Sequence, residues 1–159
     1  WTDGSIYVGN KDSEIKKFNV NDGAGVALLR QSGMKLALIS GRESNATALR
    51  ASELKIQDLY NGTLNKIIPY EELKSKYDLD DSEIAYIGDD LIDIPVMQKV
   101  AVPIATQNAS DSCKAVAVHI TNKSGGDGAF REAVEWILSK QGRLEKVILE
   151  LKDQLLNRK

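Results

Sequence analysis

The segment Ile84–Asp93 reads Ile-Ala-Tyr-Ile-Gly-Asp-Asp-Leu-Ile-Asp and decides how the rest of the sequence is interpreted. Its short run of β-forming residues is bounded by Gly88, which favours a buried strand over a helix. Asp89 and Asp90 then stand at the carboxyl end of that strand, where open α/β sheets bind their ligands. Two carboxylates with several waters would suit Mg²⁺. An acidic N-cap for the next helix is an equally good interpretation, so this segment alone leaves both open.

The composition indicates one globular domain. The chain has 159 residues, of which 42% are hydrophobic and 28% are charged. Its net charge of −2 gives no reason to expect nucleic acid or an anionic membrane as a partner. A single cysteine excludes an internal disulfide and favours a cytoplasmic location, and neither a membrane-spanning run nor a signal peptide is visible. Because the first residue is Trp1, we expect the chain to begin inside a longer one.

Strands and helices are predicted to alternate along most of the chain. Their spacings suit right-handed βαβ crossovers, so we predict an α/β fold with a Rossmann-like, doubly wound, mostly parallel sheet and helices on both faces. Before this alternation, Asp22 is placed to cap a helix over 25–31. The predicted strands cover 35–40, 56–60, 84–88, 102–105 and 118–121, and the helices between and after them cover 44–54, 66–77, 93–100, 110–116 and 129–140.

The two ends of the chain carry additional elements. Runs at Ser5–Val8 and Glu14–Val20, joined by Gly9–Asp12, predict a β-hairpin that projects from the sheet. Residues 1–142 would form the single domain. Residues 143–159 have apolar side chains at helical spacing, which predicts an amphipathic helix. That helix would dock either on the body of the domain or on another subunit.

Three predicted strand ends bring together groups that suit phosphate chemistry. The first strand ends at Ser40–Arg42, the second leads to Lys66, and the third ends at Asp89-Asp90. A hydroxyl beside backbone N–H groups at a helix start binds anions, and an ammonium group adds a point charge. Separately, Ser40 could be an ordinary N-cap and Lys66 a solvated side chain. Together with an acidic pair for Mg²⁺, they are what phosphoryl transfer needs.

The order of these motifs resembles the haloacid dehalogenase-like phosphatases. The resemblance covers the chain up to about Leu144 and is greatest to a small subgroup without a cap domain, which hydrolyses 3-deoxy-D-manno-octulosonate 8-phosphate (Kdo-8-phosphate) in lipopolysaccharide precursor synthesis. The matching stretches are Thr2–Gly4, the hairpin, Phe18–Gly23, Ile39–Arg42, Gly62–Lys66, Gly88–Asp93 and Gly125–Glu132.

The resemblance implies roles for individual residues. Ser40 would hydrogen-bond the transferring phosphoryl group, and Lys66 would hold the phosphate and the nucleophile together. Asp89 and Asp90 would hold Mg²⁺. Related phosphatases that act on nine-carbon sugar acid phosphates look to have an acidic residue at the position of Arg42. The resemblance therefore implies that Arg42 favours Kdo-8-phosphate. The hairpin would join subunits into a homotetramer. The substrate-binding residues implied are Asn19, Val20, Asn21, Asp22, Gly23, Gly41, Arg42, Arg50 and Lys66.

The sequence also departs from the family pattern. The Asp-x-Asp motif, which supplies the nucleophile and the general acid/base, is absent from the sequence, and we expect it upstream of Trp1. Without it, we would predict no phosphatase activity. Asn21 and Ala27 stand where relatives often have arginines, which leaves the exact sugar acid open.

Two other functions compete with the phosphatase. A non-catalytic domain of the same fold could hold an oligomer together through the hairpin and the C-terminal helix, although retention of Ser40, Arg42, Lys66 and Asp89 argues against a decayed site. A phospho-receiver domain uses the same residue types, but there the acidic pair precedes the hydroxyl and the lysine. His119 and Cys113 are predicted to be structural because neither has a partner at ligand spacing.

Overall fold

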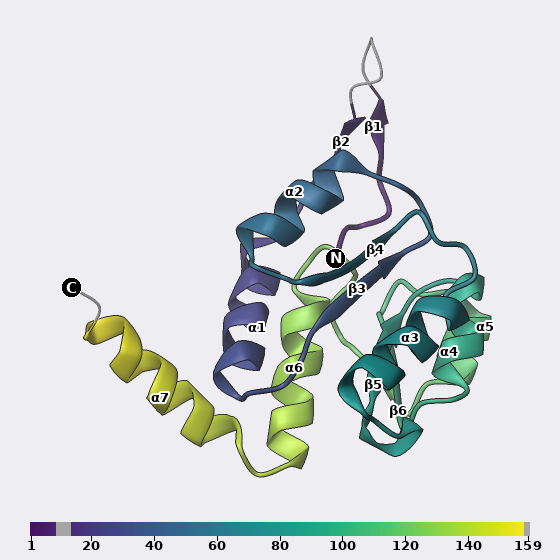
Figure 1. The fold of residues 1–159 in the computed structure, drawn as a ribbon. Coiled ribbons are helices and arrows are strands. Elements are labelled where there is room, and N and C mark those ends of the chain that lie inside the picture. The colour runs from purple at the N-terminus through teal and green to yellow at the C-terminus, as the bar shows by residue number, and fades with distance from the viewer. Residues whose placement is uncertain (9–13, 158–159) are drawn as a thin grey trace.

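The computed structural model describes residues 1–8 and 14–157 as an α/β fold (Figure 1). Single 3₁₀ turns, η1 (Asp81–Glu83) and η2 (Leu91–Asp93), flank the strand β5. The strands are β1 (Tyr7–Val8), β2 (Glu14–Ile15), β3 (Ala37–Ser40), β4 (Asp58–Asn61), β5 (Ala85–Gly88), β6 (Val102–Ala105) and β7 (His119–Ile120). The helices are α1 (Val20–Gln31), α2 (Asn45–Glu53), α3 (Ile67–Tyr77), α4 (Ile94–Met97), α5 (Asp111–Ala115), α6 (Ala129–Lys140) and α7 (Leu144–Leu156).

The predicted parallel pairing is present in two parts. β3 pairs with β4, and β5, β6 and β7 form a second parallel sheet in that order. Ser40 is in register with Asn61, and Gly88 with Ala105, so the neighbouring strands of each sheet end together. Within residues 1–8 and 14–157, β3 and β5 each pair along one edge only.

Helices cover both faces of the second sheet, as predicted. Successive side chains of a strand point to opposite faces. Accordingly, Tyr86 packs among residues of α3, α4 and α5, whereas Ile87 packs against α1 and α6. The larger cluster, under Ile87, contains Val26, Leu28, Leu29, Phe130, Val134, Leu138 and Val147.

α1 and α6 approach each other closely at Gly25. A Cβ atom at this position would lie 2.8 Å from the Cα atom of Arg131, so only glycine fits here without a shift of the backbone. Asp22 ties the same two helices together. Its Oδ1 accepts hydrogen bonds from the backbone amides of Phe130 (3.1 Å) and Arg131 (3.4 Å). Asp22 therefore caps α6. The prediction that it caps the helix over 25–31 was wrong.

The structure corrects the predicted boundaries near the N-terminus. The hairpin strand β2 ends at Ile15 and does not continue to Val20. Asn19 caps α1 instead, since its side chain accepts a hydrogen bond from the amide of Asn21 at 2.8 Å, and the helix begins at Val20. β1 and β2 pair antiparallel as predicted. The predicted turn Gly9–Asp12 lies outside the described residues.

Cys113 and His119, which were predicted to be structural, both pack against neighbouring side chains. The Cys113 side chain is buried, and its Sγ lies 3.3 Å from the Sδ of Met97. His119 stacks on Trp136 of α6 with ring centroids 4.3 Å apart. These contacts join β7 to α6 and α5 to α4.

α7 docks on the body of the domain, the first of the two arrangements predicted for it. Val147 is 3% exposed and joins the core cluster, together with the partly buried Leu144 and Leu151. Farther along the helix Leu155 is 57% exposed, and Figure 1 shows α7 extending away from the body towards the C-terminus. Among the described residues, no helix is long and apolar enough to cross a membrane.

Candidate active site

The structure brings the three predicted strand ends together. A Cβ atom at Gly41, just after β3, would lie 2.6 Å from the Cδ1 atom of Ile92 in η2, so the ends of β3 and β5 are neighbours. Lys66, directly before α3, forms an ion pair with Asp93 at the end of η2. Ser40, Lys66 and Asp89 therefore lie on segments that contact one another.

A buried ion pair fixes the geometry of this region. Lys66 Nζ lies 2.6 Å from Asp93 Oδ1, and the two side chains are 9% and 2% exposed. The Tyr86 hydroxyl donates to the same oxygen at 2.6 Å. The backbone amides of Asp89 and Asp90 donate to Asp93 Oδ2 at 3.1 and 3.2 Å. Burial favours a raised pKa for Asp93, but the Lys66 charge and these hydrogen bonds outweigh it and lower the pKa, so Asp93 stays ionised.

Asp89 and Asp90 differ in their surroundings. Asp90 acts as an N-cap, because its Oδ1 accepts a hydrogen bond from the amide of Leu91 at 2.7 Å. The pKa of the Asp89 carboxyl is raised, first by its partial removal from water and then by the charge of Asp93. A cation bound at Asp89 would favour the ionised carboxylate and so offset both of these effects on its pKa. Asp90 thus acts as the cap through one carboxylate oxygen, and Asp89 is the carboxylate whose charge a cation would favour most.

The donor set fits Mg²⁺ with few protein ligands. In the part of the chain that the structure describes, no group of three or more His, Cys, Asp or Glu side chains could hold a metal ion. Mg²⁺ usually takes one or two carboxylates and keeps several waters, which Asp89 with Asp90 can satisfy.

Ser40 and Arg42 are held by their own loop and by the hairpin. The Ser40 hydroxyl donates to the carbonyl oxygen of Arg42 at 2.7 Å. The Arg42 guanidinium pairs with Glu14 of β2 at 3.0 Å, and its side chain is 58% exposed. A hydrogen bond from Ser44, followed by the charges of Lys16 and Arg42, lowers the pKa of Glu14. Arg42 is thus oriented by the hairpin and remains open to solvent.

The first turn of α1 meets Arg50 of α2. A Cβ atom at Gly23 would lie 3.2 Å from a terminal nitrogen of Arg50, and both residues border one small recess with Asn19. Arg50 also pairs with Glu53 at 2.9 Å. Val20, in contrast, is 82% exposed.

The remaining predicted substrate residues of this turn point elsewhere. Asn21 is exposed and accepts a hydrogen bond from Arg131 at 3.4 Å. The Asp22 carboxylate is buried against α6. The predicted substrate residues are therefore gathered only in part.

Two residues that shape the site were missed in the sequence. Tyr86 carries a polar group in an apolar strand, and a buried tyrosine hydroxyl usually has a partner, which was a usable signal. Glu14 gave no local signal, because its partner Arg42 lies 28 positions along the chain.

The family model for haloacid dehalogenase-like hydrolases matches residues 36–132. The chain is 39% identical over 145 residues to 3-deoxy-D-manno-octulosonate 8-phosphate phosphatase KdsC of Salmonella typhi, covering 91% of this chain and 77% of that protein. The KdsC of Yersinia pestis is 41% identical over 144 residues, with the same coverage.

Solved structures agree with the sequence comparison. One is the 3-deoxy-D-manno-octulosonate 8-phosphate phosphatase from Moraxella catarrhalis in complex with magnesium ion, phosphate ion and KDO, with a TM-score of 0.89 and 38% identity over 94% of this chain and 86% of that one. A HAD superfamily hydrolase from Legionella pneumophila, itself described as putative, has a TM-score of 0.90 and 36% identity over 93% and 81%. The chain therefore belongs to the haloacid dehalogenase-like hydrolases, among the phosphatases of that family.

Proposed function

We propose that this protein is a Mg²⁺-dependent phosphatase that hydrolyses Kdo-8-phosphate to Kdo and phosphate in lipopolysaccharide precursor synthesis. The observation that carries the proposal is the convergence of Ser40, Lys66 and Asp89 on contacting segments at the strand ends. The identity to Kdo-8-phosphate phosphatases, together with Arg42 in an open position beside the site, supports the choice of substrate.

Each group has a distinct task in this proposal. The Ser40 hydroxyl and the Lys66 ammonium bind the phosphoryl oxygens, and Asp93 holds Lys66 in place. Asp89 and Asp90 hold Mg²⁺, which when bound neutralises phosphate charge. Arg42 and Arg50 offer planar forks that suit the carboxylate of the sugar acid. When phosphate binds, the Lys66 ammonium would be shared between Asp93 and a phosphate oxygen. This sharing would cost little, because Asp93 keeps its other three hydrogen-bond donors.

The nucleophile belongs to a strand that we place between the two sheets. β3 and β5 each have one edge without a strand partner among the described residues, and a parallel strand there would end beside Ser40 and Asp89. We propose that this strand carries the Asp-x-Asp motif of the family. Its first aspartate would attack phosphorus, displace the sugar hydroxyl and form an aspartyl-phosphate, which water then hydrolyses.

The test is phosphate release from Kdo-8-phosphate by a chain that includes the proposed Asp-x-Asp strand ahead of Trp1. We expect release with Mg²⁺, none with excess EDTA, and a loss of at least about a hundredfold in kcat for D89N and for K66M. The matched control is K99M, which removes an exposed lysine paired with Glu71 and leaves the rate unchanged. A folded, Mg²⁺-loaded protein that releases no phosphate would contradict the proposal. Faster release from a nine-carbon sugar acid phosphate would move the substrate to that class.

Association into a homotetramer through the hairpin is part of the proposal. Tyr7, Val8 and Ile15 are 56%, 77% and 65% exposed on the two hairpin strands, which is unusual for a run of apolar side chains. The same surface would serve a non-catalytic oligomerisation domain. Sedimentation of the wild type and of V8D separates the outcomes: a tetramer that falls apart in V8D supports the hairpin interface, and an unchanged mass contradicts it.

A further inference from the structure

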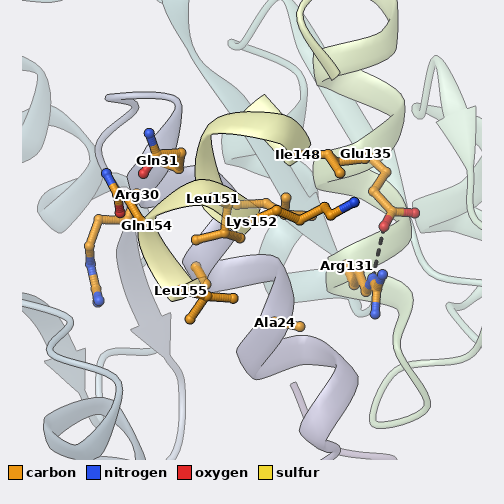
Figure 2. Close-up of a pocket in the computed structure, with 12 residues that line it drawn as sticks. Ala24, Arg30, Gln31, Arg131, Glu135, Ile148, Leu151, Lys152, Gln154 and Leu155 are labelled. Carbon is orange, nitrogen blue, oxygen red and sulfur yellow. Dashed lines mark hydrogen bonds and ion pairs between the residues drawn. The ribbon is translucent and has the colours of Figure 1, made fainter. Parts of the chain in front are cut away.

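A cleft of about 610 Å³ lies between helices α1, α6 and α7 (Figure 2). Its volume is in the range of small-molecule sites. The middle of the cleft is apolar, with Ala24, Ala27 and Leu28 of α1 on one wall and Ile148, Leu151 and Leu155 of α7 on the other. None of these residues was predicted to bind the sugar phosphate.

The cleft exists because α7 is anchored at its beginning and diverges afterwards. Arg143 donates to the carbonyl oxygen of Ser32 at 2.6 Å, and Val147 is buried in the core. Beyond these anchors, the small side chains of Ala24 and Ala27 do not fill the space that α7 leaves. Leu155 consequently remains 57% exposed.

Positive charge dominates the edge of this cleft. Its charged lining residues are Arg30, Arg131 and Lys152 against the single acid Glu135, which pairs with Arg131 at 2.8 Å. Figure 2 shows the Lys152 side chain crossing the cleft towards that pair. Within residues 1–8 and 14–157, Lys152 has no ion-pair partner. One end of an apolar cleft therefore carries two basic side chains, Lys152 and Arg131, against the single carboxylate of Glu135.

We propose that this cleft binds an amphipathic anion, a small molecule with an apolar body and one carboxylate or sulfonate group. The apolar body lies between Leu28 and Leu151, and the anionic group lies against Lys152, with Arg131 beside it. Charge complementarity favours this occupant over a second copy of the chain. Two copies that met cleft to cleft would place the same excess of positive charge against itself.

The probe for this site is the anionic dye 8-anilinonaphthalene-1-sulfonate, titrated into a folded chain that includes the proposed Asp-x-Asp strand. We expect saturable binding of one dye per chain, displaced by dodecanoate but not by the cationic dodecyltrimethylammonium. K152E should weaken binding about fivefold, as expected for the loss and reversal of a partly exposed ion pair. The matched control K146E lies on the same helix, outside the cleft, and should change affinity less than twofold.

A second variant tests the apolar part of the cleft. A27W places a large side chain in the cleft and should abolish saturable dye binding, while circular dichroism confirms that the protein is folded. Equal affinity in wild type, K152E and K146E would overturn the proposal, as would displacement by the cationic amphiphile to the same extent. A dimer that forms without ligand and is lost in A27W would overturn it in favour of a second copy.

Discussion

At the scale of single residues, the carboxylate of Asp93 collects the contacts that orient the site. It accepts from Lys66 and Tyr86 through one oxygen and from two backbone amides through the other. The position of the segment that carries Asp89 therefore depends on a side chain that need not touch substrate.

We expect D93N to destabilise the protein by about 3 kcal/mol at pH 7, because it leaves the buried Lys66 ammonium without its counter-charge. Urea unfolding measures this difference. The control K99M breaks the exposed Lys99–Glu71 pair and should cost less than about 1 kcal/mol. Similar losses in both variants would show that burial does not distinguish the two pairs.

The same pair gives a pH dependence with a defined sign. The folded-state pKa of Asp93 lies below its ordinary value of 3.8. Its contribution to stability is therefore fully present above about pH 5, and it is lost as pH falls through the folded pKa. The difference between wild type and D93N should shrink towards pH 3, and a constant difference would contradict this.

A second prediction at this scale concerns the Asp22 cap. D22A removes the acceptor that caps α6 from α1, and should cost about 1–2 kcal/mol in urea unfolding. D22N keeps an oxygen acceptor and should cost less. In D22A the amides of Phe130 and Arg131 should also exchange faster with solvent. Unchanged exchange at these two amides would mean that the cap is dispensable.

Residues whose partners are local were the ones that the sequence could predict. The helices predicted over 44–54 and 110–116 are present, and each begins one position later, with Ser44 or Ser110 as its N-cap. Asp22 was assigned to its own helix because its true partner, Phe130, lies 108 positions along the chain. Sequence spacing carries no information about a pair brought together only by folding.

At the scale of elements, the contact between α1 and α6 depends on Gly25. G25A should destabilise by about 1–2 kcal/mol although alanine favours helices, because the added carbon meets the backbone of Arg131. At Gly23, also in α1, the added carbon meets side-chain ends and no backbone: a terminal nitrogen of Arg50 at 3.2 Å and a methyl group of Leu54 at 3.5 Å. G23A should therefore be neutral or stabilise by up to about 1 kcal/mol. Thermal unfolding of the two variants tests this, and equal effects would contradict the close approach of the helices.

Element types were more predictable than element ends. β6 and α6 have the predicted bounds, and α6 in addition has a glycine near each end, Gly128 and Gly142. β2 was predicted too long because Ile15–Val20 mixes polar and apolar residues without a breaker. The cap at Asn19 decided that boundary. The cleft beside α7 had no signal at all, because it reflects the angle between helices.

At the scale of the whole molecule, the two parallel sheets should differ in protection against hydrogen exchange. β6 is paired on both sides, and Ile104 and Ala105 are fully buried. We expect their amides to exchange slowest in the 159-residue protein, and the unpaired-edge amides of β3 and β5 to exchange much faster. In a chain that carries the proposed Asp-x-Asp strand, those edge amides should become protected as well. Equal protection of β3 and β6 in the 159-residue protein would contradict the open edge.

The sulfur of Cys113, closed in against Met97, also has a practical consequence. Burial, followed by the nearby carboxylates, raises the pKa of its thiol to about 11, so the reactive thiolate is scarce at neutral pH. A chromogenic disulfide reagent such as Ellman's can modify it only when the surrounding helices separate. As urea is added, the labelling rate should therefore rise with the fraction of molecules in which these helices have separated. Cys113 labelling would then report on unfolding without an added probe. Rapid labelling in buffer alone would show that the helices around α4 and α5 open far more readily than their packing implies.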